Sequence, residues 1–343
     1  MQGAGSTSNV ALPISIDSDS ILVPNSALGN DHIDEAYGSG SNTSSAFTTI
    51  ASTDIETVQE NGRTYHGGGS YWFPNDETEN SRQRLMHHIF RIVFNGRLYF
   101  APIETDGAKV IDLGTGTGIW AIEFADCYQE AFVRAVDISP MQEKMVPPNL
   151  DHIIEDVELD WMDPENYWDY VHTRNTIQAF QNRNLLFQRA FLHLKPGGWM
   201  ECQEIDHFPK CHDGKMAVDN ELLKFCNLVA DGLERHGVKL RETCKLKDMM
   251  RAAGFVNIVE QVFHMPIGSW PESNSLKKVG WYWQTALIEG LEATALAPLI
   301  KGLGWKKDEV DSLCERTRTA CLDMTTHMYM PFYIVYGQKP FNT

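Results

Sequence analysis

The chain has 343 residues, and 46 acidic side chains against 29 Lys and Arg give it a net charge of −17 at pH 7. This acidity argues against binding to nucleic acid or to an anionic membrane surface, because both need clustered Lys and Arg. With 43% hydrophobic and 22% charged residues, the composition is that of a soluble globular protein.

The sequence contains no apolar run that approaches the roughly 18 residues of a membrane-spanning helix. No Lys or Arg precedes Arg63, so the basic start of a signal peptide is missing. We therefore expect a cytoplasmic protein, with a nuclear location left open.

The seven cysteines form no C-x-x-C pair, and their wide spacing does not predict a disulfide framework. A zinc site could be assembled from Cys202, His207, Cys211 and His212. Structural zinc usually recruits two closely spaced ligand pairs, which this set lacks, so we expect partly buried thiols, loop histidines and no metal.

Residues 1–60 are rich in Ser, Thr, Asn, Gly and Asp and contain no Lys or Arg. Such a segment buries too little apolar surface to offset its ordering entropy, so we predict a disordered acidic tail. An N-terminal helical segment is expected over 61–107, with a helix at about 79–94 that places Leu85, Ile89, Ile92 and Val93 on one face.

From residue 108 the pattern alternates between short apolar strands and helices. Strands are predicted at 110–113, 132–138, 152–156, 168–172 and 199–205, and helices at 119–127 and 185–194, the second ending at K-P-G-G. Strands separated by helices indicate parallel pairing with right-handed crossovers, so residues 108–343 are expected to form an α/β domain.

The C-terminal part departs from this rhythm. Helices are predicted at about 216–236 and 246–253, a strand at 256–264, and helices again at 272–300 and 307–327. The final run, 328–338, reads as a strand, which should begin after Pro331 if it is central, because proline cannot donate to a ladder. Two late strands split by helices predict a lid insert at about 270–327.

The strongest motif is V-I-D-L-G-T-G-T-G-I-W, from Val110 to Trp120, in which a strand enters a glycine-rich turn and then a helix. Gly114, Gly116 and Gly118 allow a ligand to approach the backbone, and the helix N-terminus faces it. Asp137 ends the next strand, where a carboxylate can accept from both ribose hydroxyls. A helix cap for 138–143 is the alternative role of Asp137.

The glycine spacing indicates which nucleoside is bound. A dinucleotide fingerprint has glycine at its sixth position, where this chain has Ile119, so a nicotinamide-dependent oxidoreductase is disfavoured. Asp112, at the tip of the strand, suits a ligand with an ammonium group, which points to S-adenosylmethionine. Asp156 is then placed to accept from the adenine amino group, although it could instead be a solvated turn carboxylate.

Several segments together resemble the class I S-adenosylmethionine-dependent methyltransferases. Examples are D-L-G-T-G-T-G, E-D-V-E-L-D-W and H-L-K-P-G-G-W-M-E-C-Q-E. More narrowly, E-N-G-R-T-Y-H, Y-W-F-P-N-D-E, G-T-G-I-W-A-I-E-F-A and D-I-S-P-M-Q resemble the LaeA-like methyltransferases of filamentous fungi, over about residues 60–340. That family includes small-molecule methyltransferases of secondary metabolism and a nuclear regulator.

The resemblance implies a Rossmann-like fold, with a seven-stranded, mostly parallel sheet, helices on both faces, a helical lid and an N-terminal extension over the cofactor. It implies that the cofactor lies among Asp112, Gly114, Thr115, Gly116, Gly118, Asp137, Ile138 and Asp156. Asn175 would lie near the methionyl carboxylate or the transferring methyl. Tyr65, His66 and Tyr71 would cover the cofactor, or would only pack their loop onto the domain.

Methyl transfer needs alignment, and a general base only for some acceptors. His172, Glu204, Asp206 and His207 are candidates because they lie at the carboxyl ends of strands, although His172 could be a core histidine. The Asn/Asp-Pro-Pro-aromatic motif of amino-methylating nucleic-acid enzymes does not follow the fourth strand.

The lid carries aromatic and aliphatic side chains, which are either core or the wall of an apolar acceptor pocket: Trp281, Tyr282, Trp283, Leu287, Leu291 and Trp305. We expect methylation of an apolar or aromatic small molecule at oxygen, nitrogen or carbon. The alternative is a LaeA-type regulator that acts through protein partners. The longest basic run is Lys306-Lys307, so no nuclear-targeting cluster supports that alternative.

Overall fold

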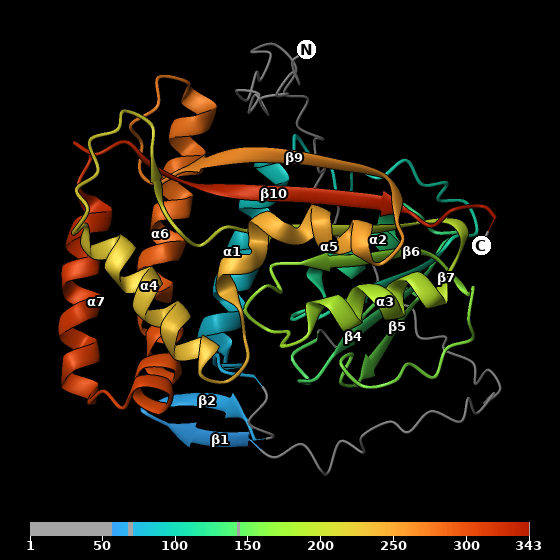
Figure 1. Ribbon diagram of the computed structural model, residues 1–343, viewed down its shortest axis with the longest axis horizontal. Helices are drawn as coiled ribbons and strands as arrows, with labels where there is room; N and C mark the ends of the chain where they lie inside the picture. The colour runs from blue at the N-terminus through green and yellow to red at the C-terminus, as the bar shows by residue number, and fades with distance from the viewer. Residues whose placement is uncertain (1–56, 68–70, 143–144, 343) are drawn as a thin grey trace, which may run out of the picture.

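An eight-stranded sheet forms the centre of the protein (Figure 1). The computed structural model describes residues 57–67, 71–142 and 145–342. The sheet order is β5-β4-β3-β6-β7-β10-β8, with β9 paired to β10. The parallel strands are β3 (Lys109–Leu113), β4 (Phe132–Asp137), β5 (Leu150–Ile154), β6 (Trp168–Arg174) and β7 (Leu194–Ile205). The antiparallel strands are β8 (Lys210–Cys211), β9 (Val256–Pro266) and β10 (Met328–Gln338).

Helices cover both faces of this sheet, as expected for the predicted Rossmann-like α/β fold. On one face, Trp120 and Phe124 of α2 (Ile119–Cys127) pack with Val110 of β3. On the other face, α3 (Arg183–His193) and α5 (Leu246–Ala252) pack over Ile111. Val110 and Ile111 are both fully or almost fully buried, so β3 is apolar on both sides, as parallel strands usually are.

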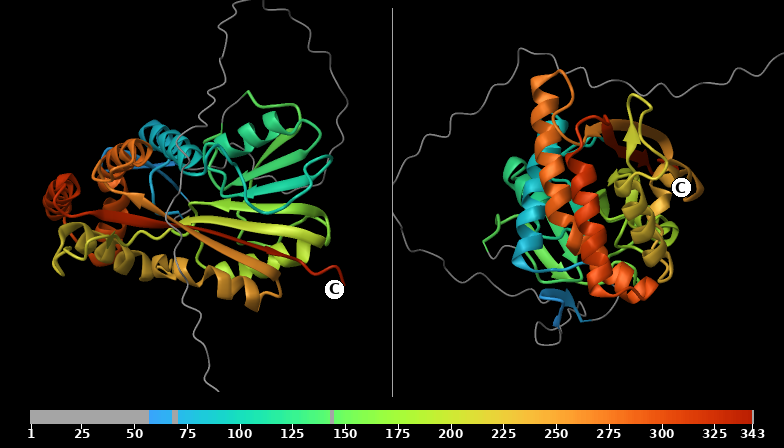
Figure 2. Two further views of the ribbon diagram at one scale, coloured as in Figure 1. Left: turned by 90° about the horizontal axis from the view of Figure 1, so that it is seen from above. Right: turned by 90° about the vertical axis from the view of Figure 1, so that its left-hand side faces the viewer.

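A bundle of helices stands at one end of the sheet (Figure 1). It comprises α1 (Glu77–Val93), α4 (Glu221–Glu234), η1 (Leu240–Lys245), α6 (Asn274–Ala297), η2 (Pro298–Gly302) and α7 (Lys307–Leu322). Figure 2 shows α1, α6 and α7 side by side. The segment between β9 and β10 is therefore helical, as the sequence predicts, and it packs against the N-terminal helix.

Strand β10 begins at Met328, three residues before Pro331, so the expectation that a central strand starts after this proline is wrong. Along β10, the pairing with β7 begins only at Phe332, and β8 pairs no further than Tyr329. Pro331 lies between these two pairings, and its carbonyl accepts from Asp206 N at 2.8 Å. Pro331 is paired with His264 of β9, but it lies just outside the residues paired with β7, so its missing N–H does not interrupt that pairing.

Other boundaries also differ from the prediction. Strand β7 includes K-P-G-G and begins at Leu194, directly after α3. The sheet has eight strands instead of seven, because the two-residue strand β8 joins its end. Residues 57–60, expected in the disordered tail, form β1 (Thr57–Glu60), which pairs with β2 (Arg63–His66). Residues 1–56 lie outside the described residues.

The β1–β2 hairpin is tied to the start of α1 by an ion pair. The guanidinium of Arg63 donates to both carboxylate oxygens of Asp76, at 2.6 and 2.8 Å. Asp76 also caps α1, where it accepts from Glu79 N at 3.1 Å. One carboxylate therefore fixes both the helix start and the hairpin that precedes it.

None of the helices in the described part of the chain has the length and apolar character needed to cross a membrane.

Candidate functional site

The glycine-rich turn joins β3 to α2, and its three glycines adopt left-handed backbone conformations that favour glycine. Gly114, Gly116 and Gly118 have φ angles of +70°, +59° and +78°, a region that costs other residues about 1–2 kcal/mol. A Cβ atom at Gly116 would lie 2.5 Å from Oε1 of Gln83 on α1. The backbone and α1 therefore form a cradle that a side chain would fill.

Asp112, the last charged residue before the turn, is held from two sides. Its Oδ1 lies 2.7 Å from His172 Nδ1, and its Oδ2 accepts from Thr115 Oγ1 at 2.6 Å. The ring of His172 is fully buried and stacks on Trp120, with centroids 3.7 Å apart. Asp112 as a whole is 3% exposed, and its carboxylate keeps lone pairs that can accept from an ammonium group at the pocket wall.

Asp137 stands opposite the turn at the end of β4. Its Oδ2 accepts from Gly116 N at 2.8 Å, and its Oδ1 accepts from Ser139 N at 2.9 Å. Burial raises the pKa of this carboxyl to about 6, despite the two backbone donors. A carboxylate whose hydration is reduced in this way suits a ligand that brings its own hydroxyl donors, as a ribose does.

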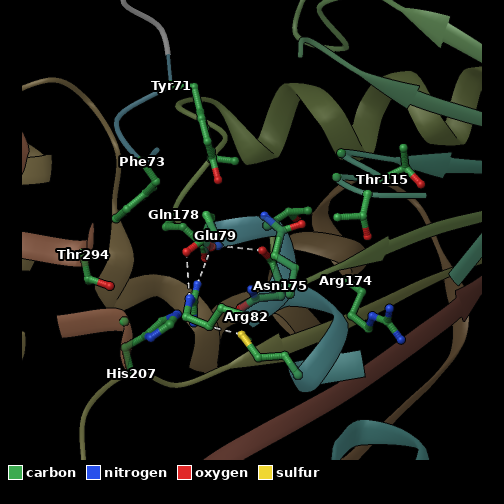
Figure 3. A pocket seen from close by; sticks show the side chains of 18 of the residues that line it. Tyr71, Phe73, Glu79, Arg82, Thr115, Arg174, Asn175, Gln178, His207 and Thr294 are labelled. Atoms are coloured by element: carbon green, nitrogen blue, oxygen red, sulfur yellow. Dashed lines mark hydrogen bonds and ion pairs between the residues drawn. The ribbon is translucent and has the colours of Figure 1, made fainter. Parts of the chain in front are cut away.

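One pocket contains most of the expected cofactor residues (Figure 3). It lies at the carboxyl ends of β3, β4 and β6 and continues beneath α1, α4 and α6. The predicted residues in its wall are Tyr71, Asp112, Gly114, Thr115, Gly116, Asp137, Ile138, Asp156, Asn175 and His207. Gly118, Tyr65, His66, His172, Glu204 and Asp206 do not line it.

Asn175 and Gln178 bring amide groups to the centre of the pocket (Figure 3). Asn175 has a φ of +53°, and its N–H donates to Gln203 O at 2.8 Å. The side-chain oxygens of Asn175 and Gln178 are buried and have no hydrogen-bond partner within the described residues. A buried polar atom of this kind points to a missing partner, which a polar ligand can supply.

Glu204 does not fit the expected role of general base. Its carboxylate is fully buried and accepts from Thr176 N at 2.8 Å, Thr176 Oγ1 at 2.6 Å and Ile177 N at 3.0 Å. Arg183 Nη1 is a fourth donor, at 3.3 Å. These bonds fix the loop that carries Asn175. His172 is likewise outside the pocket, where it orients Asp112.

His207 is the one expected general base that lines the pocket. Within the described residues its imidazole makes no hydrogen bond, and Nε2 is buried without a partner. Burial, together with the nearby cation of Arg82, lowers the pKa of His207 to about 4, so the ring is neutral at neutral pH. Figure 3 shows this ring beside Arg82.

Tyr71 and Tyr65 have different surroundings. Tyr71 lines the pocket, and burial raises the pKa of its hydroxyl, with Glu79 and Asp137 adding to the effect. Tyr65 is 4% exposed and packs into the hydrophobic core beside Lys301, whose Nζ lies 5.6 Å from the ring centroid. Tyr65 therefore fastens the hairpin instead of covering the cofactor.

Helix α1 contributes polar residues to the pocket that the sequence did not predict as site residues. Glu79 and Arg82 form a bidentate ion pair of 2.6 and 2.8 Å in the pocket wall (Figure 3). Gln83 and His87 also line the pocket. In the sequence these residues appear only as polar side chains beside the apolar face of α1. An amphipathic pattern alone does not distinguish polar side chains that line a pocket from those on a solvated face.

The wall beyond Arg82 is mostly apolar. It includes Phe73, Met86, Phe90, Leu222, Phe225, Val229, Leu240, Trp283, Ala286, Leu287 and Leu291. Of the lid residues singled out above, Trp283, Leu287 and Leu291 line the pocket. Trp281 is 54% exposed, and Tyr282 and Trp305 pack against the core. We call this apolar part of the pocket the acceptor chamber.

The grouping considered for zinc is not assembled. Cys202 is fully buried in β7, and Cys211 Sγ donates to Asp213 at 2.8 Å. Residues 57–67, 71–142 and 145–342 contain no cluster of three or more His, Cys, Asp or Glu side chains placed to hold a metal ion.

The pocket residues fit S-adenosylmethionine. A glycine cradle, a carboxylate poor in water at the ribose position and a second carboxylate for an ammonium group lie in one cavity. The unpaired amide oxygens of Asn175 and Gln178 face the same space.

Comparison with known proteins agrees with this fit. Residues 85–260 match the family described as a methyltransferase domain. The methyltransferase pytC of Aspergillus terreus is 32% identical over 302 residues, which cover 87% of this chain and 93% of that protein. A secondary metabolism regulator of Cochliobolus heterostrophus is 34% identical, covering 82% of this chain and 94% of the relative. A protein of Emericella nidulans, named protein-methionine methyltransferase laeA, is 32% identical, covering 82% and 76% respectively.

Proposed function

We propose that this chain, which belongs to the LaeA-like family of S-adenosylmethionine-dependent class I methyltransferases, methylates a small and largely apolar molecule. The observation that carries the proposal is the acceptor chamber, which is continuous with the cofactor cradle. Apolar and aromatic walls with few polar groups are typical of small-molecule sites. We place this reaction in fungal secondary metabolism and in the cytoplasm.

The protein's part in such a reaction is alignment. S-adenosylmethionine, when bound, supplies an electrophilic methyl group on a sulfonium. Asp112, Asp137 and the glycine turn hold one reactant, and the chamber beneath α6 holds the other. Restraining two reactants in this way supplies much of the rate of a bimolecular reaction.

His207 is the residue we propose to contact the polar end of the acceptor. It is neutral, it lines the chamber and it has no other hydrogen-bond partner within the described residues. A hydroxyl acceptor could donate its hydrogen to this ring. A weak base suffices at that position, because an oxygen that has gained a methyl group holds its proton very loosely. Glu79 is already engaged by Arg82, so it offers less to a cationic acceptor.

A labelling experiment tests the proposal. The purified protein is incubated with methyl-tritiated S-adenosylmethionine and a panel of phenols, terpenoid alcohols and hydroxylated fatty acids, and organic extract and acid-precipitated protein are counted separately. We expect label in the organic extract with at least one acceptor. Ala286→Leu, which fills the chamber, should abolish that label and leave the affinity for S-adenosylhomocysteine unchanged, because Ala286 belongs to the apolar wall.

The alternative is a regulator that methylates protein. It is favoured by the relatives named as secondary metabolism regulators and as a protein-methionine methyltransferase. In that case the label would appear in the precipitated protein and Ala286→Leu would not change its amount.

A further inference from the structure

Arg174 is a partly buried cation at the end of β6 that none of the expected cofactor contacts includes. It lines the pocket, and its guanidinium lies over the ring of Phe90, 5.5 Å from the centroid. Its Nη2 donates to His87 Nδ1 at 2.8 Å. Phe90 and His87 both belong to α1, so the N-terminal helix places this side chain.

The protonation state of His87 follows from its two neighbours. Its Nε2 lies 2.7 Å from Oε2 of Glu123, while the other oxygen of Glu123 pairs with Arg91 at 2.9 Å. A ring that accepts from a guanidinium at Nδ1 and donates to a carboxylate at Nε2 is neutral. Burial lowers the pKa of His87 to about 4, with Arg174 contributing in the same direction, so this form persists at neutral pH. His87 and Glu123 therefore hold the guanidinium in one orientation.

Arg174 keeps donors to spare. A guanidinium has five N–H groups, and within the described part of the chain the bond to His87 is the single hydrogen bond that the side chain of Arg174 makes. Its side chain has no carboxylate within ion-pair distance among the described residues, and burial lowers its pKa to about 10. Charged groups in buried surroundings are normally paired, so Arg174 is suited to bind an anionic group of a ligand in this pocket.

The position of Arg174 indicates which anionic group it binds. Strands β3 and β6 are neighbours, and Asp112 and Arg174 lie at the carboxyl ends of the two strands and line the same pocket. A carboxylate and a guanidinium at adjacent strand ends match the ammonium and carboxylate of an α-amino acid. Planar, forked recognition of a carboxylate is what arginine does best.

We propose that Arg174, oriented by His87 and Glu123, binds the carboxylate of the cofactor's methionyl group and makes the pocket select adenosyl ligands with a free amino-acid end. The inference concerns the cofactor alone and stands whether the acceptor is a small molecule or a protein. His87 acts here as a positioning residue.

Calorimetric titration with three ligands tests the proposal. S-adenosylhomocysteine has both amino-acid charges, its decarboxylated analogue S-adenosyl-3-thiopropylamine keeps the amine alone, and 5′-methylthioadenosine lacks both. The wild type should prefer S-adenosylhomocysteine over the decarboxylated analogue by about 10- to 100-fold, the range of one charge-assisted contact. In Arg174→Met that preference should fall to less than about threefold, with the affinity for 5′-methylthioadenosine unchanged.

Arg91→Met is the matched control, because Arg91 shares Glu123 but lies outside the pocket; its preference should equal that of the wild type. His87→Phe should lower the preference partly, an effect that a loss of stability alone would not produce. If Arg174→Met does not fold, the same ligand preference is measured for the wild type and for Arg174→Lys. A wild type without preference, or an Arg174 variant that loses all three ligands equally, would overturn the proposal.

Discussion

The imidazole of His172 lies 2.7 Å from the carboxylate of Asp112, across a parallel strand pair in which the two residues are in register. His172 belongs to the core, and Asp112 belongs to the pocket wall. The bond therefore fixes Asp112, and with it the turn that would hold the cofactor, relative to the sheet. Trp120, the second residue of α2, stacks on the same ring and completes the connection.

His172→Phe should keep the stacking on Trp120 and leave one oxygen of Asp112 without its partner. We expect a loss of about 1–3 kcal/mol in the free energy of unfolding, measured in urea, and weaker binding of S-adenosylhomocysteine. His193→Phe is the control, because His193 is also buried, stacks on Trp161 and makes one hydrogen bond, but lies outside the pocket. Equal losses of ligand affinity in the two variants would contradict the role of His172.

Gly116→Ala should weaken binding of S-adenosylhomocysteine by a larger factor than it lowers stability. The new Cβ would lie 2.5 Å from Gln83 Oε1 at a φ of +59°, and the left-handed backbone alone costs about 1–2 kcal/mol. Adding Gln83→Ala should relieve the contact and recover part of the affinity, but not the backbone cost. No recovery in the double variant would mean that Gln83 is not the limiting contact.

Binding of S-adenosylhomocysteine should depend on pH through Asp137. The pKa of this carboxyl is raised to about 6 in the free protein, so below that pH it is increasingly protonated. Ribose hydroxyls that donate to the carboxylate favour its ionised form, so binding must release the proton. The association constant should therefore fall as the pH is lowered from 7.5 to 5, by at most about tenfold per unit.

Calorimetry in buffers of different ionisation enthalpy measures that proton release directly. Asp137→Asn has no proton to release and should bind weakly, with a nearly flat profile over the same range. A wild-type profile as flat as that of the variant would show that Asp137 does not titrate with binding.

Glu204→Gln should destabilise the protein, because a glutamine amide nitrogen must face at least one backbone donor that the carboxylate now accepts. We expect a loss of about 1–3 kcal/mol and a fall in ligand affinity through the loop that carries Asn175. Glu201→Gln is matched to it, since Glu201 is equally buried and accepts from the backbone of Phe100 and Ala101. That variant should lose stability with unchanged ligand affinity. Normal stability with lost turnover in Glu204→Gln would instead restore Glu204 as a general base.

The part of the site that the sequence predicted is local in the chain. Asp112, the glycine turn and Asp137 lie within 30 residues of one another, and each has a backbone conformation or strand-end position that its residue type reveals. The helix 119–127 was predicted to the residue, because it follows Gly118 directly. Local chemistry was sufficient there.

The rest depends on contacts between distant segments. Arg174 meets His87 across 87 residues of chain, and Glu204 binds a loop 28 residues earlier. Contacts between residues so far apart in the chain leave no periodic pattern in a single sequence, so neither pairing could be predicted from it. Pro331 is the opposite case: the local rule predicts a strand that starts after this residue, but β9 pairs with β10 through Pro331, while β7 pairs with β10 only from Phe332 onward.

Calorimetric titration with S-adenosylhomocysteine, set against Asp137→Ala and against NADH as a comparison ligand, is the decisive test of the cofactor site. We expect the wild type to bind with a dissociation constant on the order of micromolar, the variant to lose that binding, and NADH not to bind. A wild type that ignores S-adenosylhomocysteine, or that binds NADH equally well, would contradict the assignment of this pocket to methyl transfer.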